Sequence, residues 1–210
     1  MDLNCVYSSR RLKEIKHAIF AVMFMITMLG CTSTAQKEDN PLPNQDTKRF
    51  AAEYPLVGSD NLFVFRNAAE TADILANGTG VVFIGFKECP WCQRYAVYLN
   101  DAAKESGLAR IFYCDILEDR QNNTADYQRI VSILSGALQY DDEGRPRVFV
   151  PDVTVINNGK IVGRDYESSK DTLGYEKPEE YWTGERVSAL KERLMDSMSQ
   201  IHSSCNLCNY

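Results

Sequence analysis

The sequence predicts an α/β domain in which helices cover a central sheet. Val81 to Phe86 form an apolar run without alternation, which is typical of a strand buried on both faces. Asp152 to Ile156 and Lys160 to Gly163 predict two strands joined by a turn at Asn157-Asn158-Gly159. An amphipathic helix that packs on the sheet is expected last, because apolar residues recur at helical spacing: Val187, Leu190, Leu194, Met198 and Ile201.

The remaining elements alternate between strand and helix along the chain. A short strand at Leu62 to Phe65 precedes a helix that ends near Leu75, and Asn67 with Glu70 predicts a capping box at its start. After the central strand, a helix runs to Gly107 as its C-cap. The sequence then predicts a strand, a helix and a loop, in that order: Arg110 to Asp115, Thr124 to Leu138 and Asp141 to Pro146.

Length and charge narrow the class of protein. The 210 residues are enough for one sizeable domain with additional targeting and linker sequence. The net charge is −6, and no cluster of Lys and Arg occurs outside the N-terminal region. We therefore expect no nucleic acid among the partners, because nucleic-acid binding depends on a basic surface.

Residues 1 to 30 are predicted to be an export signal. A basic region precedes an apolar segment from Ala18 to Gly30, which is shorter than the roughly 20 residues that cross a bilayer as a helix. The segment ends at Met28-Leu29-Gly30-Cys31, which resembles the lipobox of bacterial lipoproteins. This resemblance implies that Cys31 is lipidated and anchors the exported protein to the outer face of the bacterial cell membrane. The alternative is an uncleaved anchor helix, which also leaves the domain outside the cytoplasm.

Residues 31 to 53 are predicted to be the lipidated cysteine and a flexible tether. The segment is polar, contains Pro41 and Pro43, and shows neither a helical nor a strand period. The folded domain is therefore expected at residues 54 to 202, followed by a short tail at residues 203 to 210.

Cys89-Pro90-Trp91-Cys92 lies where the central strand gives way to the next helix. Two thiols at this spacing can close into one disulfide. At a helix N-terminus, the backbone N–H groups and the positive dipole end favour thiolate over thiol. Cys89 is therefore the expected nucleophile and Cys92 the resolving thiol. A structural disulfide or a zinc site with the same spacing is the alternative.

With this motif between strand and helix, and Val150-Pro151 before a hairpin and a final helix, the chain resembles the thioredoxin superfamily over residues 60 to 202. The resemblance implies a thioredoxin-like fold with a central mixed sheet flanked by helices, and chemistry that needs no cofactor. It also implies that Pro151 is cis beside the two cysteines and that the Val150 backbone pairs with an extended substrate. The alternative is an X-Pro that simply starts an edge strand.

Several neighbours of the motif bear on its chemistry. Trp91 either forms an apolar lip for the substrate or packs on its own loop. Phe83 stands six residues before Cys89, at the position where thioredoxins carry a buried Asp. Lys87 and Glu88 would act on the pKa of Cys89 in opposite directions, because an ammonium lowers a thiol pKa and a carboxylate raises it.

The other thiols near or beyond the domain have separate interpretations. Cys205 and Cys208 form a second CxxC in the tail, and we hypothesise that this pair exchanges with Cys89 and Cys92 as a redox relay. The alternatives are a terminal disulfide that holds the helix end, or a metal site with His202. Cys114 lies in a predicted strand and is expected to be a buried small hydrophobe.

These features lead us to expect a membrane-anchored, extracytoplasmic thiol-disulfide oxidoreductase acting on exported proteins or peptides, with an unidentified redox partner. Phe83-Ile84-Gly85 before a Cys-Pro-aromatic-Cys helix is also similar to the bacteriocin transport accessory proteins. Two other functions remain open. One is a binding module with a structural disulfide, in which the insertion from Tyr166 to Trp182 contacts a partner. The other is a copper or zinc chaperone that uses Cys89 and Cys92.

Overall fold

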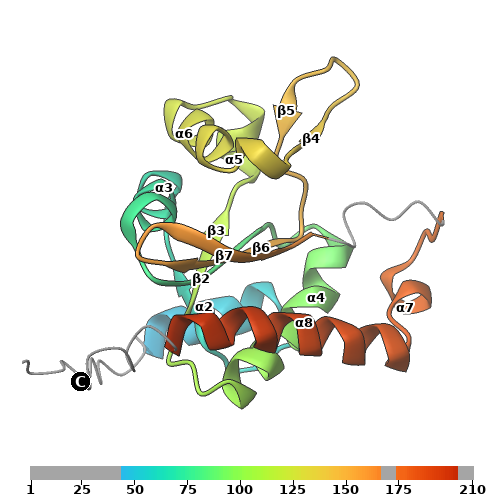
Figure 1. Cartoon of the computed structure of the whole chain (residues 1–210). Helices are drawn as coiled ribbons and strands as arrows, with labels where there is room; N and C mark the ends of the chain where they lie inside the picture. The colour runs from blue at the N-terminus through green and yellow to red at the C-terminus, as the bar shows by residue number, and fades with distance from the viewer. Residues whose placement is uncertain (1–43, 167–173, 203–210) are drawn as a thin grey trace, which may run out of the picture. The chain divides into compact units, whose positions relative to one another are not determined.

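The computed structural model describes residues 44–166 and 174–202, which form an α/β fold around a five-stranded mixed sheet (Figure 1). The strand order is β1-β3-β2-β6-β7. Strand β3 pairs in parallel with β1 and β2, whereas β6 is antiparallel to both β2 and β7. The strands are β1 (Phe63–Phe65), β2 (Gly80–Gly85), β3 (Ile111–Asp115), β6 (Asp152–Asn157) and β7 (Lys160–Asp165). The expected α/β class with a mixed sheet flanked by helices is thus confirmed.

Helices cover both faces of this sheet (Figure 1). One face, which we call the α4 face, lies under α2 (Asn44–Glu53), α4 (Pro90–Glu105) and α8 (Gly184–His202). The opposite, or α3, face lies under α3 (Ala68–Asn77) and α6 (Ala125–Ile133). Because successive strand residues point to opposite sides, Phe83 of β2 belongs to the α4 face and Ile84 to the α3 face. Both side chains are completely buried, as a strand without alternation predicts.

The prediction that residues 31 to 53 form a flexible tether is wrong for its last ten residues, which form helix α2. Phe50 of this helix is completely buried and stacks on Phe63, with 3.8 Å between the ring centroids. Phe50 is the one large apolar side chain of this otherwise polar helix. A single apolar residue produces no helical period, which is why the sequence did not predict α2. The folded part therefore includes residues 44–53, which precede the predicted start at residue 54. The rest of the predicted tether and the predicted export signal lie outside the described residues.

Most of the other predicted elements are present. The predicted capping box of α3 is confirmed, because the Glu70 amide donates to Asn67 Oδ1 over 2.8 Å and the Asn67 amide donates to Glu70 Oε2 over 2.9 Å. The hairpin of β6 and β7 is also present. Helix α8 buries Leu190, Leu194 and Met198 against the sheet, as its spacing predicts.

The region between β3 and β6 differs from the prediction. The helix predicted from Thr124 to Leu138 ends at Ile133 and is followed by a 3₁₀ turn. The loop predicted from Asp141 to Pro146 is the turn of a small hairpin, in which Asp141 Oδ1 accepts backbone hydrogen bonds from two following residues. Such local bonds to an Asp side chain favour turns. The additional elements are α5 (Leu117–Gln121), β4 (Gln139–Tyr140) and β5 (Pro146–Arg147).

The insertion before α8 packs on the side of α4. Its short helix α7 (Pro178–Tyr181) carries Glu179, whose carboxylate lies 2.9 Å from the Arg94 guanidinium of α4. Trp182 is buried, with its ring edge-on to Tyr95 at 5.9 Å. Among the helices of the described ranges, none has both the length and the apolar character needed to cross a membrane.

Candidate active site

The two cysteines of the CxxC motif lie at the start of α4, directly beyond the end of β2. Cys89 is the N-cap residue, and its carbonyl accepts the first helical hydrogen bond from the Gln93 amide over 3.0 Å. Pro90 follows at the first helical position, where its missing N–H costs nothing and its fixed φ suits the helix. The Gln93 side chain donates to the carbonyls of Glu53 and Lys87, which ties the loop to the end of α2. Local sequence thus fixes the position of the dithiol.

The two thiols occupy different environments although they are neighbours. Cys89 retains 7% exposure and its Sγ accepts a hydrogen bond from the Cys92 amide over 3.2 Å, whereas Cys92 is completely buried. Hydrogen bonding from the Cys92 thiol, supported by backbone N–H groups, lowers the pKa of Cys89 despite its burial. Burial raises the pKa of Cys92 well above its ordinary value, and the neighbouring Cys89 raises it further. The pair therefore combines a slightly exposed thiol with a lowered pKa and a completely buried thiol with a raised pKa.

Arg120, at the end of α5, is the cation that acts on this pair. Its positive charge contributes to the lowered pKa of Cys89 and also acts on Cys92. The guanidinium carbon lies 5.1 Å from the centre of the Phe86 ring, and Nη1 donates to the Val148 carbonyl over 3.3 Å. Lys87 and Glu88, the charges considered from the sequence, instead form an exposed ion pair at 3.9 Å. Nothing in the local sequence pattern indicates Arg120, because the chain folds it back from a separate element.

Two tyrosines form the polar surroundings of Cys92 on the α4 face. The Tyr54 and Tyr113 hydroxyls are hydrogen-bonded at 2.9 Å in the core. A Cβ atom at Gly85 would lie 3.3 Å from Cys92 Sγ and 3.4 Å from Tyr54 Oη, so this glycine leaves the space in which thiol and hydroxyl approach each other. Burial raises the pKa of both tyrosines, which keeps them neutral hydrogen-bonding groups.

Asp115 is the carboxylate nearest in register to this region. It pairs with Gly85 across β2 and β3, and burial raises its pKa. Phe83, by contrast, is completely buried among aromatic rings and supplies no proton acceptor at its position. Tyr54, Tyr113 and Asp115 were not predicted from the sequence. Asp115 is the polar residue that ends the apolar strand β3, and nothing in that strand indicates a dithiol at the start of the preceding helix α4.

Pro151 immediately precedes β6, the strand that pairs with β2. The Val150–Pro151 peptide bond is cis, as the resemblance implies. Ile84 pairs with Asp152 in the antiparallel register of β2 and β6, which places Pro151 opposite Gly85. Gly85 lies next to Cys92, because a Cβ atom at this glycine would be 3.3 Å from Cys92 Sγ. Val150 is half-buried and packs against the cores of both faces. The structure thus brings Pro151 to the strand position beside Gly85.

Trp91 is half-buried and packs edge-on against Tyr181 of α7, with 5.4 Å between the ring centroids. It therefore contacts the insertion rather than only its own loop. The side chain is only partly buried, so this packing leaves part of it exposed.

The other predicted site residues are separate from this site. Cys114 is completely buried on the α3 face, which confirms it as a buried small side chain, and burial raises its pKa to about 12. Cys31, Cys205 and Cys208 lie outside the described residues. Within the described ranges, no three His, Cys, Asp or Glu side chains are grouped so that they could hold a metal ion.

Neither the models of known protein families nor the curated proteins match this chain.

Proposed function

We propose that this chain is a thioredoxin-like thiol-disulfide oxidoreductase in which Cys89 is the nucleophile and Cys92 the resolving thiol. The observation that supports this most directly is the asymmetry of the dithiol at the α4 N-terminus. Cys89 caps the helix, keeps an accessible edge and accepts the Cys92 amide, while Cys92 is completely buried behind it. An inert disulfide needs no such difference between its two sulfur atoms, whereas stepwise exchange does.

The proposed reaction transfers two electrons in two displacement steps. The Cys89 thiolate attacks one sulfur of a substrate disulfide, which forms a mixed disulfide and releases the other substrate sulfur as a thiolate. Cys92 then gives its proton to the substrate thiolate released in the first step and attacks Cys89 Sγ. This step closes the Cys89–Cys92 disulfide and releases the second substrate sulfur, so the substrate is reduced and the protein oxidised. Run in reverse, the same steps oxidise a substrate dithiol.

The surroundings of the pair provide for both steps. Arg120 and the α4 N-terminus stabilise the Cys89 thiolate before it attacks the substrate. They stabilise it again in the reverse direction, in which Cys89 is the leaving group. Deprotonation of Cys92 is the more demanding step because burial opposes its charge. The Tyr54 hydroxyl beside it offers a hydrogen bond to the forming thiolate, with Asp115 as the nearby carboxylate.

Val150, Pro151 and Trp91 are the residues that we expect to contact the substrate. An extended segment of an exported protein or peptide would pair with the Val150 backbone and present its sulfur to Cys89. Lipidation at Cys31 would hold the domain at the outer face of the cell membrane. The physiological redox partner exchanges electrons with the same pair, and Cys205 with Cys208 is a candidate relay within the chain.

The reduction potential of the Cys89–Cys92 pair tests this proposal. We would equilibrate the chain carrying Cys205→Ser and Cys208→Ser in glutathione buffers and measure the fraction of oxidised Cys89–Cys92 by thiol trapping. A value below about −250 mV would indicate a reductant, and one above about −180 mV an oxidant or isomerase. A pair that no such buffer reduces would be a structural disulfide, and the catalytic proposal would be rejected.

Two further measurements separate the alternatives. Metal that remains bound in stoichiometric amount after purification would favour the metal chaperone. Removal of residues 203–210 tests the relay, because unchanged exchange kinetics would show that the tail thiols take no part.

A further inference from the structure

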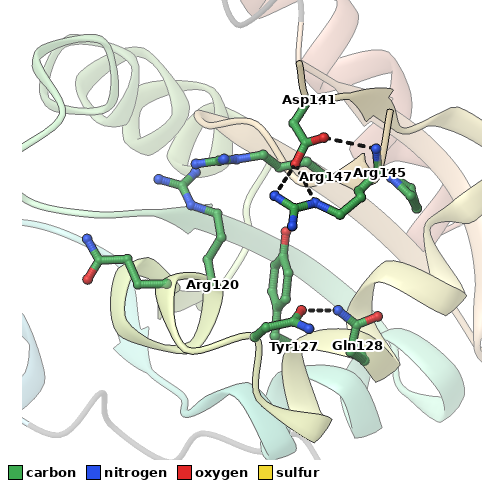
Figure 2. A pocket seen from close by; sticks show the side chains of 9 residues that line it. Arg120, Tyr127, Gln128, Asp141, Arg145 and Arg147 are labelled. Carbon is green, nitrogen blue, oxygen red and sulfur yellow. Dashed lines mark hydrogen bonds and ion pairs between the residues drawn. The ribbon is translucent and has the colours of Figure 1, made fainter. Parts of the chain in front are cut away.

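A polar pocket lies between α5, α6 and the small hairpin of β4 and β5. It has a volume of about 360 Å³, and three arginines line it together with Tyr127 and Asp141 (Figure 2). The three arginines come from two separate segments, with Arg120 at the end of α5 and Arg145 and Arg147 on the β5 side of the hairpin. We call this site the arginine pocket. An excess of positive charge in a concave site suits an anionic group.

One of these arginines is already neutralised. Arg145 Nε and Nη2 both lie 3.0 Å from Asp141 Oδ2, and its Nη1 lies 2.7 Å from a Glu143 oxygen (Figure 2). Asp141 is also fixed by backbone hydrogen bonds from Glu143 and Arg145. The carboxylate at the pocket wall is therefore committed to Arg145 and does not compensate the other two arginines.

Arg120 and Arg147 have no such partner. In the part of the chain that the structure describes, neither forms an ion pair, and the Nε of each is buried without a hydrogen bond. The two side chains are close enough to repel each other: burial lowers the pKa of Arg120, and the charge of Arg147 lowers it further. Two half-buried guanidinium groups that face each other without an anion are unfavourable, and a carboxylate between them would satisfy their donors and their charge.

The arginine pocket is connected to the dithiol. Arg120 acts electrostatically on Cys89 and donates to the Val148 carbonyl, two residues before Val150. Arg147 precedes Pro151 by four residues, so the chain between them spans at most about 14 Å. A peptide extended along this segment from Cys89 would reach the pocket about four residues from its reacting cysteine.

We propose that the arginine pocket binds a carboxylate of the peptide substrate, located about four residues from the cysteine that reacts with Cys89. The proposal rests on the proposed oxidoreductase function and adds selectivity to it. A planar guanidinium pairs with a carboxylate through two parallel hydrogen bonds, so two arginines can hold one carboxylate firmly. The carboxylate is supplied either by an acidic side chain or by the C-terminus of a short peptide. The arginine pocket thus selects acidic substrates, whereas Cys89 alone accepts any accessible disulfide.

Matched peptides test this selectivity in the full chain. Each peptide carries one cysteine in a mixed disulfide with 2-mercaptoethanol, and either Glu or Gln about four residues away, on one side or the other. Two further short peptides end about four residues after the cysteine, one with a free C-terminal carboxylate and one with an amidated C-terminus. Comparing them shows whether the pocket binds a terminal carboxylate as well as a side-chain carboxylate. The chain is first reduced with dithiothreitol, which is then removed, and stopped-flow kinetics give the rate of exchange. A parallel set with Ser in place of Cys reports binding alone by fluorescence anisotropy.

We expect the Glu peptide to bind and react about tenfold better than the Gln peptide, and the difference to shrink at high salt. Arg147→Met should abolish the difference in binding and in rate between the Glu and Gln peptides. Arg147→Lys should restore part of the preference because it keeps the charge. The matched control is Arg129→Met, which removes an arginine on α6 that pairs with Asp73 and Asp126. This variant should retain the preference.

The outcomes separate this proposal from the proposed function. Equal binding and equal rates for Glu and Gln peptides in the unmodified chain would reject the carboxylate site and leave the oxidoreductase intact. Binding of the Glu peptide without any exchange would keep the site and reject the oxidoreductase. If Arg147→Met does not fold, the carboxylate site is still tested by the Glu–Gln comparison and its salt dependence, because both are measured on the unmodified chain.

Discussion

Cys89 on the α4 face and Cys114 on the α3 face are both buried, but their pKa values are shifted in opposite directions. On the α4 face, Cys89 caps a helix and accepts hydrogen bonds that lower its pKa. On the α3 face, Cys114 is the penultimate residue of strand β3 and belongs to a mostly aliphatic core, and burial raises its pKa to about 12. Both side chains are less than a tenth exposed. Burial alone therefore does not decide thiol reactivity, because donors and charges around the sulfur outweigh it at Cys89.

The faces also differ in how their cores are built. The α4 face contains a set of stacked and edge-on aromatic rings that joins α2 to the strands, with Phe50 at its centre. The α3 face is mostly aliphatic, and α3 contributes small side chains with Leu75 as its largest completely buried one. The aromatic face also contains the Tyr54 and Tyr113 hydroxyls beside Cys92. The α4 face thus combines a packed aromatic core with polar groups near the dithiol.

Removal of the central ring of the α4 face should have the largest effect. Phe50→Ala is expected to lower the free energy of unfolding by about 3–5 kcal/mol, because it deletes a completely buried ring that stacks on two others. Chemical denaturation followed by circular dichroism measures this change. Leu75→Ala on the α3 face should cost about 2–5 kcal/mol in the same assay.

Leu56→Ala, which alters a half-exposed side chain just beyond α2, is the control and should change stability by less than about 0.5 kcal/mol. A Phe50→Ala variant as stable as the unmodified chain would show that α2 does not belong to the folded core.

Alkylation of the reduced full chain should separate Cys89 from Cys114. A thiolate reacts and a thiol does not, so the lowered pKa of Cys89 gives it more thiolate at pH 7 than an ordinary cysteine. Its rate with iodoacetamide should rise with pH and level off at a midpoint below the usual value of about 8.5. Cys114, with a pKa of about 12, stays protonated over this range. We expect Cys89 to react at least about a hundredfold faster at pH 7, as measured by mass spectrometry of each peptide.

The control is the same reaction in concentrated urea, where the chain is unfolded and all its cysteines should be alkylated. It shows that the alkylated Cys114 peptide can be detected when it forms. A midpoint for Cys89 at or above the ordinary thiol value would contradict the activated nucleophile.

Removal of the Arg120 charge should have the smallest effect. Arg120→Met should raise the pKa of Cys89, because one of the groups that stabilise its thiolate is lost, although hydrogen bonding from Cys92 acts more strongly. The expected fall in alkylation rate at pH 7 is about twofold, the scale of a partly solvated charge interaction. Arg129→Met removes an equal charge outside the site and should leave the rate unchanged. An unchanged midpoint in Arg120→Met would show that α5 has no influence on the dithiol.

The sequence alone determined most of the sheet, the helices that carry a clear periodic or capping signal, and the identity of the dithiol. Apolar runs, spacing and capping residues are local signals, so β2, the α3 capping box, the hairpin of β6 and β7, and α8 were predictable. The position of Cys89 and Cys92 at a strand-to-helix junction follows from the same signals. Helix α2 was not predictable, because a single aromatic residue in a polar segment produces no period.

Only the tertiary structure decided which side chains surround the dithiol. Tyr54 and Tyr113 are 59 positions apart, and Arg120 belongs to a helix on the far side of β3 in sequence, yet all three lie close enough to Cys92 to act on it. The arginine pocket likewise combines α5, α6 and a hairpin that the sequence did not reveal. The physical reason is that local periodicity encodes helices and strands, whereas strand order and helix packing determine which distant side chains meet.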